Sequence, residues 1–333
     1  MRRILTIWML LGLIANWAEE TALQTKVDVA VAKGLAALAK MQREDGSLGS
    51  NTGYTSLAAM AFLAGGHTPD RGQYAPQTKK CLEALLSRQD PMTGYLGNDG
   101  GNMYAHGFAT LFFAECAGMS ADPRLRRAIE AALDLIYRSQ NAAGGWRYDP
   151  APTDADISVT ICQVMAIRAA YNAGIGGERS QDAMGRAVKY VEKSSRKNGT
   201  FTYTLDGSAW SGLQAVPSCA AGIMCLQGAG ITKLDHPILG PAYTYLRGSV
   251  LDHLHGGDNW YWYGQYYCSQ AMFLSPDSKD WDRYWPAATK HLLESQREDG
   301  AWSQFSYGGN EYGTAVALII LQIPNQYLPI YQR

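Results

Sequence analysis

A short turn motif recurs along this 333-residue chain and constrains its fold more than any other feature. Its clearest copies are Gln296–Trp302, which reads QREDGAW, and Gln140–Trp146, which reads QNAAGGW. Each glycine can adopt the positive φ that ends a helix, and an aromatic residue often follows it. The turn glycines recur about every 45–55 residues, which is typical of a helical array. They are Gly46, Gly94, Gly145, Gly199 and Gly300, with one double interval filled by Gly256-Gly257 before Trp260.

The segment Arg138–Gly174 represents the repeating unit. A helix ends at the glycine turn, a polar loop follows, and a long apolar run begins at Ile157. Asp154 or Asp156 can cap that second helix by accepting hydrogen bonds from its first backbone N–H groups. The unit is therefore helix, turn with an aromatic side chain, and helix.

The helices of each unit differ in character. One, such as 125–136, carries an apolar stripe opposite charged residues, whereas the next, such as 157–170, is apolar nearly all round. A striped helix faces water on one side, and an apolar one is covered on every side. Six pairs of outer and inner helices predict an all-α fold, an α/α toroid of the α6/α6 double-barrel type. We expect one domain over residues 22–333, because no linker divides this stretch.

Composition limits the function. The formal net charge is −1 and no basic stretch is present, which argues against nucleic acid as a partner. Hydrophobic residues make up 47% of the chain, enough for a large core. The six cysteines lie mostly among apolar neighbours without Cys-x-x-Cys spacing, so we expect small buried residues. Neither a metal nor another cofactor is predicted.

The N-terminus stands apart from the repeats. Arg2-Arg3 precede an apolar run over residues 4–15, which is typical of a secretory signal peptide in residues 1–18. Cleavage after Ala18 or Ala15 would export the protein to the periplasm or cell envelope. An uncleaved N-terminus is the alternative, and it would associate the protein with a membrane.

The turn motifs resemble the repeats of squalene/terpenoid cyclases and protein prenyltransferase β subunits. Segments such as Met103–Glu115 (MYAHGFATLFFAE) and Tyr261–Phe273 (YWYGQYYCSQAMF) are similar to uncharacterised bacterial prenyltransferase/squalene-oxidase-repeat proteins. The resemblance spans nearly the whole chain after the signal peptide and implies an α/α toroid. It implies no particular reaction.

In a toroid the inner helices begin at the mouth of a central cavity, where we expect a site. Aromatic and acidic residues gather at these helix starts and after the turns. The candidate ligand-binding residues are Tyr104, His106, Trp146, Trp260, Tyr263, Tyr266, Glu311 and Tyr312. Aromatic faces there would suit an isoprenoid and would stabilise a carbocation by about 0.5–2 kcal/mol each.

Asp154 and Asp156 are the candidate catalytic residues. Asp154-Ala155-Asp156 resembles the DxDD motif of class II terpene cyclases, with Asp156 at the position of the proton-donating acid and Ile157 in place of the last Asp. The simpler interpretation is that both carboxylates cap the third inner helix. His106 similarly has two interpretations, a cavity hydrogen-bonder or a core histidine bonded to a loop carbonyl.

Three functions remain open from the sequence. The first is binding of a small apolar, isoprenoid-like molecule, with cyclase or isomerase chemistry started by protonation. The second is a non-catalytic scaffold or binding module that recognises an envelope component. The third is glycan cleavage, because α/α toroids also include polysaccharide lyases and glycosidases.

Overall fold

The computed structural model describes residues 2–207, 212–255, 260–303 and 309–332. In this part of the chain the secondary structure is helical, with twelve α-helices and no β-strand. The helices are α1 (Arg2–Met41), α2 (Thr52–Ala64), α3 (Ala75–Arg88), α4 (Asn102–Ala117), α5 (Pro123–Ser139), α6 (Ile157–Asn172), α7 (Gly177–Ser194), α8 (Val216–Gly228), α9 (Leu239–His253), α10 (Tyr261–Phe273), α11 (Ser278–Ser295) and α12 (Gly309–Gln322).

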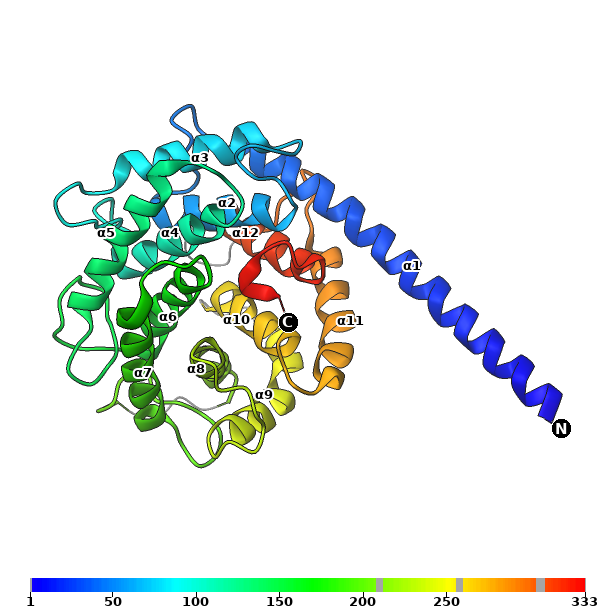
Figure 1. Cartoon of the computed structure of the whole chain (residues 1–333). Helices are drawn as coiled ribbons and strands as arrows, with labels where there is room; N and C mark the ends of the chain where they lie inside the picture. The colour runs from blue at the N-terminus through cyan, green and yellow to red at the C-terminus, as the bar shows by residue number, and fades with distance from the viewer. Residues whose placement is uncertain (1, 208–211, 256–259, 304–308, 333) are drawn as a thin grey trace.

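The helices form two concentric rings. The even-numbered helices make the inner ring, in which each helix packs on its two neighbours and α12 packs on α2 (Figure 1). The odd-numbered helices cover them from outside. The predicted α/α toroid is therefore confirmed.

The two rings follow from the sequence pattern of their helices. In α2 every residue except Tyr54 is buried. In α5 the residues Leu125, Ile129 and Leu133 are buried, whereas Arg127 and Glu130 on the opposite face are exposed. An amphipathic helix can cover an apolar one only from the solvent side, which places α5 in the outer ring.

The turn glycines hold successive units together. Gly144 has a φ of 101°, and a Cβ built on it would lie 2.1 Å from the Arg186 carbonyl oxygen of the next outer helix. Of the predicted pair Gly144-Gly145, Gly144 has the positive φ and occupies the turn position, so the recurring turn glycine of this unit is Gly144 and not Gly145. The four equivalent glycines have positive φ and meet a backbone carbonyl of the next outer helix in the same way: Gly46, Gly94, Gly199 and Gly300. The predicted turn at 256–257 lies outside the described residues.

The glutamine of the motif connects neighbouring units through hydrogen bonds. Gln140 Nε2 donates to the carbonyl oxygens of Gly144 and Ala183, at 2.7 and 2.9 Å. Gln296 Nε2 donates in the same manner to Gly300 and to Ala30 in α1, both at 2.9 Å. The last repeat is thus bonded to the first, which closes the ring.

The two ends of the chain lie differently. The C-terminal part of α1 is the first outer helix, and its N-terminal part extends away from the rings (Figure 1). The predicted signal peptide lies in this extension and stays a prediction. Among the described helices none combines the length and apolarity that crossing a membrane requires.

The chain returns to the ring after α12 and closes one end of it. Two 3-10 turns, Ile323–Asn325 and Pro329–Tyr331, follow α12 and lie inside the outer ring, where the second turn packs on α6 (Figure 1). Tyr331 is buried, and its hydroxyl lies 3.5 Å from that of Tyr266 in α10. The central cavity is therefore confined to the opposite end.

Candidate functional site

A cavity of about 360 Å³ lies where the inner helices begin. Its walls come from the starts of α2, α4, α10 and α12 and from the loops before α4 and α6. The lining residues are Asn51, Gly53, Tyr54, Leu57, Gly100, Gly101, Asn102, Tyr104, Ala105, Phe108, Tyr148, Trp260, Tyr263 and Tyr312. The cavity thus lies at the predicted end of the toroid and has six Tyr or Trp side chains in its wall.

Three of the cavity tyrosines have their hydroxyls engaged in hydrogen bonds to the protein. The Tyr104 hydroxyl bonds to Ser158 Oγ, and the Tyr263 hydroxyl donates to the Ser158 carbonyl oxygen at 3.1 Å. The Tyr148 hydroxyl bonds to that of Tyr203. These three residues therefore offer mainly the carbon surface of their rings to a ligand.

The described residues that line the cavity carry no formal charge. None of its lining residues has a carboxylate, ammonium or guanidinium group. Burial raises the pKa of Tyr54, Tyr104, Tyr263 and Tyr312 above the ordinary value of 10, so their hydroxyls stay protonated at neutral pH. The site can contribute ring faces and neutral hydrogen-bond donors.

Asp156 lies behind this wall as the N-cap of α6. Its buried carboxylate accepts hydrogen bonds from the backbone N–H groups of Ser158 and Val159 at 2.8 and 2.9 Å, and from Ser158 Oγ at 2.6 Å. Arg147 Nε lies 3.7 Å from its other oxygen. Burial raises the Asp156 pKa, and the hydrogen bonds and the Arg147 charge oppose that rise. Ser158 and Tyr104 separate this carboxylate from the cavity.

Asp154 has a different environment from Asp156. Its side chain is 60% exposed and forms an ion pair with Arg147, in which Arg147 Nη1 lies 2.9 Å from Asp154 Oδ2. The same guanidinium lies over the rings of Tyr148 and Tyr203, 5.2 and 5.8 Å from their centroids. Arg147 therefore holds the loop before α6 together, and Asp154 does not face the cavity.

His106 makes a packing interaction between units. Its Nδ1 accepts a 3.2 Å hydrogen bond from the Leu96 backbone N–H, so Nε2 carries the proton and donates to the Ala132 carbonyl oxygen at 3.1 Å. In the next unit the corresponding backbone N–H, that of Trp146, donates to Thr160 Oγ1. His106 therefore takes the place that Thr160 has in that unit. Burial lowers the pKa of His106 to about 4, which keeps the ring neutral.

The remaining predicted residues divide between wall and core. Tyr104, Trp260, Tyr263 and Tyr312 line the cavity. Trp146 is buried and donates to the Ile136 carbonyl oxygen, and Tyr266 packs edge-on below Phe108 with centroids 5.8 Å apart. The half-buried Glu311 does not line the cavity.

Sequence reasoning missed several lining residues, among them Asn51, Asn102 and Tyr148. Tyr54 lines the cavity at the start of α2 as Tyr104 does at the start of α4, in agreement with the expected gathering of aromatic residues at the inner-helix starts. No local signal marks Tyr148, whose place depends on how the loop before α6 folds back toward α4, where its carbonyl oxygen accepts from the Met103 N–H.

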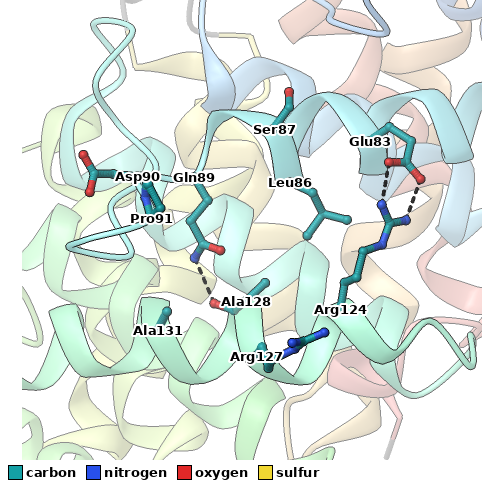
Figure 2. Close-up of a pocket in the computed structure, with 10 residues that line it drawn as sticks. All are labelled: Glu83, Leu86, Ser87, Gln89, Asp90, Pro91, Arg124, Arg127, Ala128 and Ala131. Carbon is teal, nitrogen blue, oxygen red and sulfur yellow. Dashed lines mark hydrogen bonds and ion pairs between the residues drawn. The ribbon is translucent and has the colours of Figure 1, made fainter.

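Other hollows lie away from the ring centre, among them one on the outer surface and one at the opposite end of the ring. A groove of about 430 Å³ runs over the outer surface between α3 and α5 (Figure 2). Within it Glu83 pairs with Arg124 at 2.6 Å, and Gln89 donates to the Ala128 carbonyl oxygen at 2.9 Å. A hollow of about 350 Å³ lies at the opposite end of the ring beside the C-terminal turns.

The structure is similar to known toroids. A variant of the type II terpene cyclase MstE from Scytonema, solved with the substrate geranylgeranyl dihydroxybenzoate, superposes with a TM-score of 0.63, at 15% identity over 93% of this chain and 99% of that one. The GH76A α-1,6-mannanase from Salegentibacter gives a TM-score of 0.67, at 10% identity over 92% of this chain and 100% of that one. The chain is an α/α toroid.

These similarities establish the fold. At sequence identities of 10–15% they do not establish a shared function. A mannanase variant with α-1,6-mannotriose bound is also similar, with a TM-score of 0.66 at 10% identity over 89% of this chain and 98% of that one. No protein-family model and no curated protein matches the sequence. Structurally similar toroids therefore hold an isoprenoid in one case and a glycan in the other. Which kind of ligand a toroid binds depends on the residues that line its cavity.

Proposed function

We propose that this toroid binds a small apolar, isoprenoid-like molecule in its central cavity and does not catalyse cyclisation. The observation that carries the proposal is the cavity wall. Its described residues include six tyrosine and tryptophan side chains with Leu57 and Phe108, and none of them is charged. The cavity volume of about 360 Å³ falls within the size range of small-molecule sites. Apolar surface removed from water would supply the affinity.

The position of Asp156 argues against cyclase chemistry. A general acid must reach the substrate atom that it protonates, at about 3 Å. Asp156 is engaged in capping α6, and Ser158 Oγ and then the Tyr104 hydroxyl connect it to the cavity wall. Burial raises the pKa of Tyr104 well above 10, which makes this phenol a poor proton donor to an alkene.

Glycan cleavage is less well supported than binding. Glycosidases commonly place two carboxyl groups beside the scissile bond. The lining residues of this cavity contribute none. The likeness to the mannanase is therefore taken as one of fold.

Ligand binding can be tested on the purified protein. Titration with farnesol, followed by tryptophan fluorescence and native mass spectrometry, should show saturable one-to-one binding, whereas α-1,6-mannotriose should not bind. Trp260→Ala and Tyr312→Ala should each weaken farnesol binding at least about fivefold by removing cavity wall. Tyr327→Ala, at a tyrosine that is 54% exposed and outside the cavity, is the matched control. Equal binding by all four proteins, or saturable binding of mannotriose alone, would reject the proposal.

We also propose that residues 1–18 direct export, on the strength of the basic and apolar pattern of the N-terminus. The intact mass of the protein isolated from its native host should correspond to cleavage after Ala18 or Ala15. A mass that includes Met1 would support the uncleaved, membrane-associated alternative.

A further inference from the structure

The polarity of the cavity wall changes from the mouth of the cavity to its inner end. Asn51, Tyr54, Asn102 and Tyr104 stand at or near the beginnings of α2 and α4, whereas Leu57 and Phe108 lie about one helical turn further in. The polar side chains therefore gather at the mouth, and the inner part is apolar.

Two donors at the mouth come from asparagines. Asn51 Oδ1 accepts hydrogen bonds from the backbone N–H groups of Gly53 and Tyr54 at 2.9 and 3.4 Å, and Asn102 Oδ1 accepts from that of Tyr104 at 2.9 Å. A backbone N–H can only donate, so each amide must direct its oxygen to the helix. Each Nδ2 group is then left to donate elsewhere.

Two further donors come from tyrosines. Tyr54 and Tyr312 line the cavity side by side, with ring centroids 5.5 Å apart. Among the described residues, neither hydroxyl has a hydrogen-bond partner, in contrast to Tyr104 and Tyr263. Within the described part of the chain, the mouth thus offers up to four neutral donors and no charged lining group to balance an ionised ligand.

We propose that the ligand is an uncharged apolar molecule with one oxygen-bearing head group, such as an alcohol or carbonyl. Its head accepts hydrogen bonds at the mouth from Tyr54, Tyr312 and the two asparagines, and its hydrocarbon body packs against Leu57 and Phe108. A site built to hydrogen-bond a head group discriminates against an analogue that lacks it, because the donors are then left unpaired. This inference rests on the proposed binding function and specifies its ligand class.

Farnesol and farnesene form a suitable pair of probes, because they share a hydrocarbon skeleton and differ in the hydroxyl. Wild-type protein should bind farnesol about tenfold more tightly than farnesene. The double variant Tyr54→Phe/Tyr312→Phe keeps both rings, and it should lose most of this preference while its farnesene affinity stays within about twofold. Tyr327→Phe, with its tyrosine outside the cavity, should behave as wild type.

The outcomes separate the two proposals. If neither probe binds the wild-type protein, apolar binding itself is rejected. If both bind wild type equally, or if the double variant keeps the full preference for farnesol, the head-group inference is overturned while apolar binding stands. Loss of farnesene affinity in the double variant would also overturn it, because ring packing would then be the property that changed.

Discussion

Replacing Glu115 by glutamine should make the toroid more stable at alkaline pH. Glu115 lies near the end of α4, where its side chain is 1% exposed. The Ile330 backbone N–H of the C-terminal turns favours its ionised form and partly offsets the effect of burial on its pKa, and its Oε2 has no hydrogen-bond partner among the described residues. Burial raises the pKa of this carboxyl from 4.5 to about 8, so it is mainly protonated at neutral pH.

The size of the effect follows from linkage. At about 1.4 kcal/mol per pKa unit, a pKa raised from 4.5 to about 8 corresponds to about 5 kcal/mol. The folded protein binds this proton more tightly than the unfolded chain does. The free energy of unfolding therefore falls as pH rises from about 4.5 to about 8, and the Glu115 contribution is constant above that range.

Urea unfolding of wild type and Glu115→Gln at a series of pH values measures this contribution. Near pH 4.5 the two should have similar free energies of unfolding, because a glutamine resembles the protonated acid and can accept from Ile330. Near pH 9 the variant should be more stable by several kcal/mol, up to about 5. Glu298→Gln, at an exposed position, should show no such divergence.

A difference between wild type and Glu115→Gln that stays constant across this pH range would refute the reasoning. It would mean that Glu115 has the same proton affinity in the folded and unfolded states. A variant less stable than wild type at pH 9 would also contradict it, because an ionised Glu115 would then have a stabilising partner.

Three further predictions concern the repeats. Gly144→Ala should lower the free energy of unfolding by about 2–4 kcal/mol because its Cβ would lie 2.1 Å from the Arg186 carbonyl oxygen. Gly185→Ala, whose Cβ would meet open space within the outer helix α7, should instead raise the free energy of unfolding by about 0.5–1 kcal/mol. Urea unfolding of the two variants and the wild type measures both effects. Gln296→Ala should cost about 1–3 kcal/mol and reduce hydrogen-exchange protection in the outer-ring part of α1; unchanged protection would show that the ring closes without this bond. Asp156→Ala should cost about 1–2 kcal/mol through the lost cap and Asp156→Asn less, in thermal unfolding, with farnesol binding retained in both. Loss of farnesol binding in a folded Asp156→Asn protein would show that Asp156 takes part in ligand binding.

The overall architecture could be predicted because its signals are local. A glycine at positive φ, an aspartate at a helix start and a striped or uniformly apolar helix each depend on residues within a few positions. Repetition of these signals about every 50 residues is enough to predict pairs of helices in a ring. The predicted cavity end could likewise be inferred, since every inner helix begins at the same side.

The directions of individual side chains could not be predicted in this way. A motif locates the start of a helix, but whether a residue faces the cavity or the neighbouring unit depends on helix rotation and on partners far along the chain. His106 begins an inner helix as Tyr104 does, yet it bonds outward to Leu96 and Ala132. Asp156 is separated from the cavity by Tyr104, which lies 52 positions earlier in the sequence.

The sequence by itself thus determined the repeat, the two classes of helix and the closed double ring, because each depends on short-range stereochemistry and on the burial pattern of a single helix. Only the tertiary structure decided which tyrosines present ring faces, which keep a free hydroxyl, and that Glu115 is covered by the C-terminal turns. These properties arise from contacts between units that are distant in sequence, and such contacts exist only once the ring has closed.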